Sequence, residues 1–235
     1  MGPSLRDITR NLAINSDGLH TITITADGII VQDPSNVSQA LRNVNTTIVS
    51  TNSGAGGLDT GSMASSTWYY IWAIAKADGT TAAMLSLSST APTMPTGYTY
   101  KSLIGTALNQ PSANLMYFKQ RGNLVICAQY AVSIVNTGSI ATHNVPLGIS
   151  PLAVKIVGYV NGACSNVSTW SLNLWPYNDG SGIGNIGIMT QGTQGAVSTM
   201  TVPFILPLIV AQTFYSTVTP PATTGTVSIT GWEYV

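Results

Sequence analysis

The sequence predicts an all-β protein in which a smaller β-rich region with one or two short helices precedes an antiparallel, jelly-roll-like β-sandwich. Strand-like segments recur after residue 110 at intervals of roughly 8–15 residues, separated by Gly or Pro clusters, the spacing typical of sandwiches and jelly rolls. Residues 67–75 alternate like a strand with both faces covered. The sequence shows no internal repeat of fixed period, which disfavours a solenoid.

The first fifty residues are predicted to form a docking region with one β-hairpin and short helical segments. A capping-box-like start at Ser4, with apolar residues at helical spacing behind it, predicts a short helix or an irregular arm. Alternating Thr and Ile residues then predict a hairpin that turns at Asp27-Gly28. An Asp-Pro pair next precedes an apolar pattern at helical spacing, so we expect a short helix over residues 34–43.

Residues 51–110 are predicted to form a three-stranded β module with an aromatic centre. A loop rich in Gly, Ser and Thr leads into the first strand, where Trp68, Tyr70 and Trp72 share one face and are expected to form a structural aromatic core. An Asp-Gly pair supplies the residues of a tight turn into the second strand. A segment with two prolines then connects to the third strand.

Residues 111–235 are predicted to form the sandwich, and a polar run with a proline at residues 109–114 marks the expected domain boundary. The predicted strands are residues 115–119, 123–135, 140–147, 153–161, 168–175, 183–191, 197–205, 208–213 and 226–234. Cys127 falls in the second of these, where a small buried thiol is the common arrangement. The sequence leaves open whether Cys127 is paired with Cys164, the only other cysteine.

Five short motifs follow one another in the central module. They are GLDTGS, TWYYIW, DGT, PTxPxGYTY and a following IG, all within residues 54–105. In this combination and order they resemble a module of tailed-bacteriophage and prophage virion proteins, which are fibre, spike or tail-associated proteins. The resemblance implies a β-rich, trimeric structural protein of a virion, assembled in the cytoplasm of a bacterial host beside other virion proteins. It transfers no catalytic residue.

The chain is almost uncharged, and this limits its classes of partner. Only 7% of the 235 residues are Asp, Glu, Lys or Arg, and the formal net charge is zero, whereas about 25% charged residues is usual. Nucleic-acid binding requires clustered Lys and Arg, so we expect no nucleic-acid partner. Near-zero net charge promotes association, so we expect self-assembly, as the trimer that the resemblance implies. The most apolar run, residues 202–211, is too short to cross a bilayer, so we expect no membrane insertion.

One tetrapeptide matches the surroundings of a catalytic carboxylate. Asp59-Thr60-Gly61-Ser62 has the sequence found at the catalytic aspartate of aspartic proteases, whose chemistry needs two carboxylates that share a proton. The sequence has no second Asp-Thr-Gly, and a Gly-rich loop rather than an apolar strand precedes the motif. We therefore favour an Asx-turn in which Asp59 caps backbone amides, and keep an aspartic-type hydrolase using Asp59 as a remote alternative.

No other sequence pattern predicts catalysis, a metal or a cofactor, and we expect a protein that is not an enzyme. His20 and His143 have no Cys or carboxylate at metal-ligand spacing. No G-x-S-x-G motif is present in the sequence. A G-x-G-x-x-G pattern at residues 182–187 has no helix predicted after it, so we interpret it as a glycine-rich hairpin and not as a dinucleotide site.

An aromatic and polar set in the sandwich region suits sugar rings, because aromatic faces can stack on a sugar while amide and carboxylate groups bind its hydroxyls. The set consists of Trp170, Trp175, Tyr177, Asn178 and Asp179. In the alternative that we favour, both tryptophans are core or subunit-interface residues and Tyr177 lies at the rim.

Taken with the resemblance, the sequence predicts a trimeric tail fibre, spike or tail-tip component of a bacteriophage virion. Its first residues would dock onto the particle, and its sandwich would point outward to recognise a host-cell glycan. The alternative is a capsid-decoration or head-fibre protein with no receptor role. The sequence does not distinguish tail from head, and it names no receptor.

Overall fold

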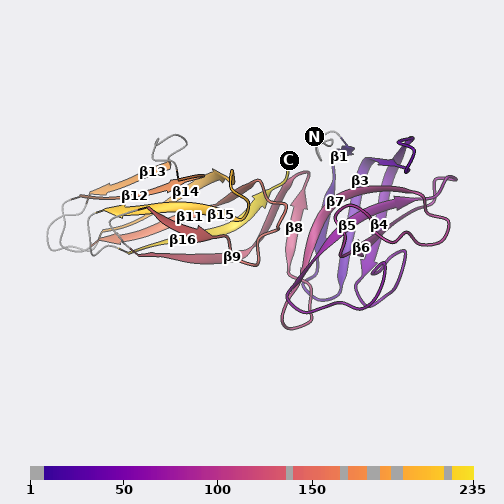
Figure 1. Cartoon of the computed structure of the whole chain (residues 1–235), viewed down its shortest axis with the longest axis horizontal. Coiled ribbons are helices and arrows are strands. Elements are labelled where there is room, and N and C mark those ends of the chain that lie inside the picture. The colour runs from indigo at the N-terminus through magenta and orange to yellow at the C-terminus, as the bar shows by residue number, and fades with distance from the viewer. Residues whose placement is uncertain (1–7, 136–139, 165–168, 179–185, 192–197, 220–223) are drawn as a thin grey trace. The chain divides into compact units, whose positions relative to one another are not determined.

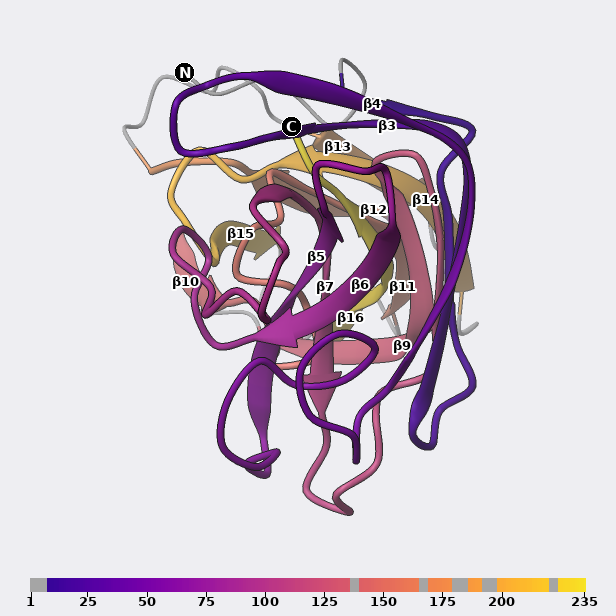
Figure 2. The same cartoon turned by 90° about the vertical axis from the view of Figure 1, so that its right-hand side faces the viewer.

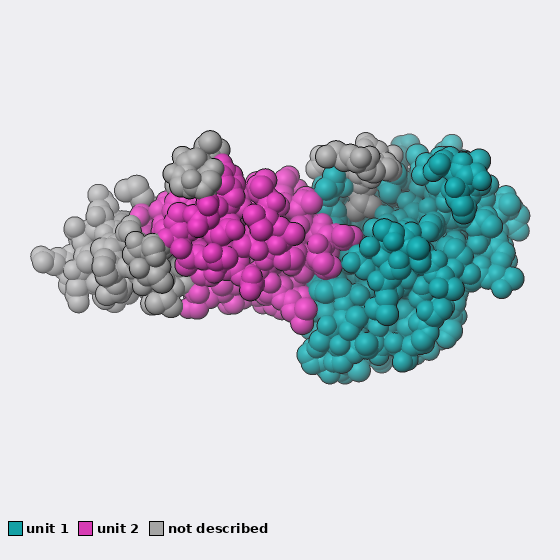
Figure 3. All heavy atoms as spheres, viewed as in Figure 1, with its two compact units in different colours: residues 1–127, 234–235 teal, residues 128–233 magenta. Residues whose placement is uncertain are grey.

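The computed structural model describes residues 8–135, 140–164, 169–178, 186–191, 198–219 and 224–235. These form two compact units: unit 1 comprises residues 1–127 and 234–235, and unit 2 comprises residues 128–233 (Figure 3). Every named element of the described residues is a β-strand, and every strand pair whose register is described is antiparallel. The predicted all-β class is therefore confirmed. No helix among the described residues is long and apolar enough to cross a bilayer.

The strands of unit 1 pair in the order β8-β2-β3-β7-β5-β6, with β1 and β4 also paired to β3 (Figure 1). They are β1 (Thr9–Arg10), β2 (Ala13–Ser16), β3 (Thr21–Gln32), β4 (Ser38–Val49), β5 (Thr67–Ala75), β6 (Thr81–Ser86), β7 (Tyr100–Asn109), β8 (Phe118–Arg121) and the start of β9 (Leu124–Val135). Figure 2 shows β3 and β4 running side by side along their length, and Figure 1 shows β5 between its partners β7 and β6.

The aromatic module folds as the alternation predicts. Residues 71–75 of β5 are all buried, as expected for a strand with both faces covered. The Asp-Gly turn joins β5 to β6: Gly79 has a φ of 90°, which glycine adopts without steric cost, and Asp78 Oδ1 accepts the Thr80 N–H at 2.8 Å.

The expected hairpin turn at Asp27-Gly28 is wrong. These residues lie inside β3, where Gly28 pairs with Arg42 of β4 on one side and Arg10 of β1 on the other. Because neighbouring strands satisfy the backbone on both sides, the chain continues straight through a pair that would reverse it in isolation.

Asp27 instead marks the point at which β3 changes the face that it buries. The buried residues of β3 are even-numbered up to Ala26 and odd-numbered from Ile29. The same shift occurs in β4 at Asn43, where φ is 50°, and Asn11, with a φ of 52°, donates a hydrogen bond to Asp27 Oδ2. Asn tolerates this left-handed conformation better than most residues. The row of Asn11, Asp27 and Asn43 therefore allows the neighbouring strands to change their buried face at the same level of the sheet.

The expected helix over residues 34–43 is also wrong. Asp33 caps a hairpin turn: its Oδ1 accepts the N–H groups of Ser35 and Val37 at 2.9 and 2.8 Å. From residue 38 the chain pairs with β3, and this ladder outweighs the helical spacing of the apolar residues. The helix or arm expected at Ser4 lies largely outside the described residues, and the chain is extended at β1 and β2.

The described part of unit 2 contains two sets of antiparallel strands, ordered β14-β11-β16-β9 and β10-β15-β12-β13. Its strands are the rest of β9, β10 (Ala141–Asn144), β11 (Lys155–Cys164), β12 (Thr169–Trp175), β13 (Ile186–Gln191), β14 (Ser198–Pro207), β15 (Thr213–Thr219) and β16 (Thr224–Glu233). A Cβ added to Gly225 of β16 would lie 2.5 Å from Leu172 Cδ1 of β12, so the two sets pack closely face to face, as in a β-sandwich. The jelly-roll topology stays a prediction.

Residues 208–213 do not form the expected strand. Pro207 ends β14, Gln212 has a φ of 55°, and the Thr213 N–H bonds to the Val210 carbonyl at 3.2 Å, which closes a turn. The next strand, β15, begins only where that turn ends. An apolar run with proline before it therefore forms a connection here, although its composition resembles a strand.

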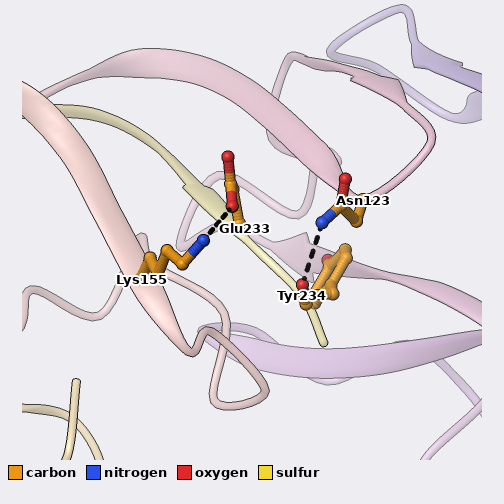
Figure 4. Close-up of polar contacts among 4 residues, drawn as sticks. All are labelled: Asn123, Lys155, Glu233 and Tyr234. Atoms are coloured by element: carbon orange, nitrogen blue, oxygen red, sulfur yellow. Dashed lines mark hydrogen bonds and ion pairs between the residues drawn. The ribbon is translucent and has the colours of Figure 1, made fainter. Parts of the chain in front are cut away.

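The two units divide within β9, between Cys127 and Ala128. The polar run that we expected at the boundary, residues 109–114, forms the turn between β7 and β8 inside unit 1. The chain crosses from unit 2 to unit 1 again after Glu233. Glu233 Oε2 accepts a hydrogen bond from Lys155 Nζ at 2.9 Å within unit 2 (Figure 4), whereas Tyr234 belongs to unit 1.

Candidate functional site

The residues that the sequence singles out for sugar binding are only partly described. Trp170 and Trp175 belong to β12, but the Trp170 side chain and Asp179 lie outside the described residues. Trp175 and Tyr177 are half-buried, and Asn178 is exposed. Sugar binding by this set stays a prediction, as does its alternative of a core or interface role.

Of the three aromatic residues expected to form a core, Trp72 is buried in unit 1. Trp72 is 5% exposed, whereas Trp68 and Tyr70 are half-buried. The buried cluster around Trp72 consists of Trp72, Ile74 and Met84. The Trp72 indole N–H donates to the Ser88 carbonyl at 3.0 Å, and Lys101 Nζ lies 5.3 Å from the ring centroid. Trp72 therefore stabilises the module and is not an exposed platform for a ligand.

Asp59 joins separate parts of the central module. Its Oδ2 accepts hydrogen bonds from Ser86 Oγ at 2.6 Å and from the Thr93 N–H at 2.9 Å, and its Oδ1 accepts the Thr60 N–H at 2.7 Å. Donors engage both oxygens, so the carboxylate acts as a cap. Its local hydrogen bond is to the next N–H in the chain rather than to the N–H two residues on that closes an Asx-turn, and its other donors come from two distant segments. Nothing in this geometry supplies the shared proton that an aspartic-type hydrolase needs.

Each histidine contacts a serine. His143 Nε2 lies 2.7 Å from Ser216 Oγ, its ring stacks on Phe214 with 5.0 Å between centroids, and burial lowers the pKa of His143. Ser216 is 0% exposed, so its hydroxyl is not accessible as a nucleophile. His20 Nδ1 lies 3.4 Å from Ser50 Oγ. Within the described residues, no group of three or more His, Cys, Asp or Glu side chains could hold a metal ion.

Cys127 is not a reactive nucleophile either. Its thiol is free, and burial raises its pKa to about 12, so it stays protonated at neutral pH. Cys127 is therefore not in a disulfide, and the side chain of Cys164 lies outside the described residues.

An open hollow of about 520 Å³ lies on unit 1, and we call it the β2–β8 hollow. Its lining residues are Asn15, Ser16, Asp17, Thr21, Thr23, Tyr117, Lys119 and Arg121. A neighbouring hollow of similar volume shares Arg121 with it. The side chains that line the β2–β8 hollow are polar, charged or aromatic, which suits recognition of a polar ligand.

Strand β8 supplies the positive charges of this hollow. Phe118 and Gln120 are buried, so Lys119 and Arg121 point to the opposite, exposed face. Gln120 fixes the strand from inside: its Nε2 donates to the carbonyl oxygens of Ile104 at 2.9 Å and of Gly122 at 2.8 Å. The two cations are therefore held on one side of a strand whose position is set by buried hydrogen bonds.

Strand pairing brings residues of β2 and β3 beside those of β8. Lys119 lies opposite Asn15, and Asn15 lies opposite Thr23, which makes a row across three strands. Tyr117 precedes β8, is 52% exposed, and packs against Gly18, where an added Cβ would lie 3.2 Å from Tyr117 Cβ. The hollow therefore combines one half-exposed ring with amide, hydroxyl and cationic groups.

Asp17 is the one acidic residue that lines the hollow, and one oxygen of its carboxylate accepts two backbone hydrogen bonds. Its Oδ1 accepts the N–H groups of Leu19 at 2.7 Å and Thr21 at 3.0 Å. Burial raises the pKa of Asp17, but these hydrogen bonds and the nearby His20 outweigh burial, so its pKa is lowered and it stays ionised. With Lys119 and Arg121, the lining side chains carry two positive charges and one negative charge.

The β2–β8 hollow is not among the sites predicted from the sequence. Its signal is the pattern Tyr117-x-Lys119-x-Arg121, which places three long side chains on one face of a strand in a chain with few charges. Asn15 and Thr23 lie about a hundred residues earlier in the sequence, and such distant partners are set by sheet register rather than by local pattern.

Comparisons with known proteins assign no family to this chain. No family model and no curated protein matches it. Among solved structures, it is similar to a chain from a crystal structure of the IBDV viral particle, with 9% identity and a TM-score of 0.25, and to a chain from a structure of infectious bursal disease virus strain Gx, with 8% identity and a TM-score of 0.23. Each alignment covers 94% of this chain and 66%, just under two thirds, of the other. These likenesses are too weak to carry an argument.

Proposed function

We propose that this chain is a structural protein of a tailed-bacteriophage virion, a trimeric component of a tail fibre, spike or tail tip that meets a host-cell glycan. The observation that carries the proposal is that hydrogen bonds join several of the five motifs that resemble the virion module. Asp59 of GLDTGS binds Thr93 of PTxPxGYTY and Ser86 between these motifs, and Trp72 of TWYYIW binds Ser88. The residues that resemble the virion module are thus those that hold one substructure together.

The surface of unit 2 supports self-assembly. Leu147, Ile205 and Ile209 are 58%, 59% and 67% exposed. In the described part of unit 2, the charged side chains are Lys155 and Glu233, and they pair with each other at 2.9 Å. A surface with exposed aliphatic residues and no unpaired charge among its described residues favours burial against another protein surface.

The oligomeric state tests this proposal. We expect light scattering on the purified chain to give the mass of three chains at micromolar concentration. Ile209→Asp should weaken the trimer, because a charge would be buried in the interface. Leu87→Asp is the matched control, since Leu87 is 61% exposed but belongs to unit 1. A stable monomer at micromolar concentration would contradict the assembly argument.

The position on the particle separates the proposal from its alternative, a capsid-decoration or head-fibre protein. Antibody labelling of intact particles, viewed by electron microscopy, should mark the tail. Labelling of the head would favour the alternative and remove the reason for a receptor role. In the part of the chain that the structure describes, the donors on Asp59 are those of Thr60, Ser86 and Thr93, and they do not support the remote alternative of an aspartic-type hydrolase using Asp59.

A further inference from the structure

We infer that the β2–β8 hollow binds a saccharide that carries a carboxylate group. This inference rests on the proposed function, which brings the surface into contact with cell-surface glycans, and it names the class of glycan and the site. It places glycan binding in unit 1 and not at Trp170 and the other residues that the sequence predicts for sugar binding.

The positive charges of the hollow are available to a ligand. Arg121 Nη1 donates to Asn15 Oδ1 at 3.2 Å and to the Gln120 carbonyl at 2.9 Å, and neither acceptor is a carboxylate. Lys119 and Arg121 take part in neither ion pair that the structure describes, Arg10–Asp27 and Lys155–Glu233. The hydrogen bonds of Nη1 hold the guanidinium in place while its other donors can bind a carboxylate as a fork.

The remaining lining groups suit a sugar ring. Tyr117 offers a half-exposed ring held against the turn at Gly18, and stacking on such a ring orders few rotatable bonds. Asn15 and Thr23 present an amide and a hydroxyl in the same row as Lys119. A ligand with one anionic group and several hydroxyls matches this combination more closely than a purely apolar or a purely anionic ligand does.

Nucleic acid and an acidic protein surface fit less well. A nucleic-acid site needs a track of cations along a backbone of phosphates, whereas the hollow has two cations and one carboxylate, that of Asp17. The hollow is lined by eight residues, far fewer than the roughly 20–30 residues that each side of an extended protein interface contributes.

The test is calorimetric titration of the full chain with three carboxylate-bearing probes: oligogalacturonate, a hyaluronan oligosaccharide and oligosialic acid. Each probe is compared with its carboxyl-reduced form. We expect at least one probe to bind, with an affinity about tenfold or more above that of its reduced form, the size of effect of one hydrogen-bonded charge.

Variants locate the site. Lys119→Gln/Arg121→Gln should weaken binding of that probe by about tenfold or more, because it removes both cations. Arg42→Gln/Lys76→Gln removes the same charge elsewhere in unit 1 and should leave binding unchanged. Tyr117→Leu should weaken binding, whereas Tyr117→Phe, which keeps the ring, should not.

Three results would overturn the inference: no binding of any probe, equal binding of a probe and its reduced form, or equal loss in the two double variants. Light scattering and particle labelling on the same proteins keep the two proposals separate. A trimer found on the tail that binds no probe refutes the saccharide site alone. A monomer absent from the particle that still binds a probe refutes the virion role alone.

Discussion

The hydroxyl oxygen of Tyr234 lies 2.8 Å from that of Thr106 within unit 1, although 128 positions separate the two residues. Thr106 is fully buried, and Tyr234 is 5% exposed. The Tyr234 N–H also donates to the Asn123 carbonyl at 3.0 Å, and Asn123 Nδ2 donates to the Tyr234 carbonyl at 3.2 Å (Figure 4). The residue that follows β16 is thus fixed in unit 1 by its side chain and by its backbone.

Tyr234→Phe should lower the free energy of unfolding by about 1 kcal/mol, the net worth of a typical intramolecular hydrogen bond. Thr106→Val should have a similar cost. The double variant should cost less than the sum, because both changes remove the same bond. Urea unfolding of the four proteins checks this, and additive costs would show that the two hydroxyls do not interact. Tyr117→Phe, at an exposed ring, is the control.

Trp72→Ala should be strongly destabilising. It leaves a cavity beside Ile74 and Met84 and removes the indole bond to the Ser88 carbonyl, and large-to-small changes of this kind cost roughly 3–5 kcal/mol. We expect low soluble yield or a sharply lower melting temperature. Trp72→Phe keeps most of the ring and should be milder. A Trp72→Ala variant with normal melting and lost attachment to cells would show that Trp72 serves binding rather than the core.

Asp59→Asn should loosen the segment that precedes β7 without unfolding unit 1. An amide has one acceptor oxygen, so either the Thr60 donor or the donors from Ser86 and Thr93 lose their partner, at a cost of about 1–2 kcal/mol. Hydrogen exchange should report faster exchange over residues 87–99. In Asp78→Asn, where the carboxylate caps only its own turn, this segment should be unchanged, and an equal response would contradict the long-range role of Asp59.

Acid should destabilise the chain through His143. Burial lowers the pKa of His143 in the folded state below its ordinary value of 6.5. The unfolded chain therefore takes up the proton first, so the stability contributed by the neutral ring is present above about pH 6.5 and is lost as the pH falls through the folded-state pKa. Melting temperatures measured from about pH 8 to about pH 5 should fall.

His143→Gln should flatten the pH dependence of the melting temperature in that window, because it removes the titrating group. His20→Gln, at an exposed residue, should keep the dependence. A wild-type melting temperature that stays constant over this range would show that His143 has the same pKa folded and unfolded.

The sequence by itself determined the β class, the aromatic strand and its turn. The alternation of residues 67–75 and the pair Asp78-Gly79 are local signals, and their backbone conformations follow from steric rules that act within a few residues. A capping role for Asp59 was also predicted, because Asp side chains often accept hydrogen bonds from backbone N–H groups close to them in the chain, whereas its bonds to Ser86 and Thr93 are not local.

Only the tertiary structure decided what happens where neighbouring strands compete with local preference. Asp27-Gly28 has the composition of a turn, yet pairing on both sides keeps it inside β3, and the ladder of β3 with β4 replaces the helix expected over residues 34–43. The β2–β8 hollow is also decided by strand pairing, because the register of β2 and β8 places Lys119 beside Asn15. Such pairings join residues far apart in sequence. The burial and hydrogen bonds that stabilise them involve both partners, so a short stretch of sequence does not reveal them.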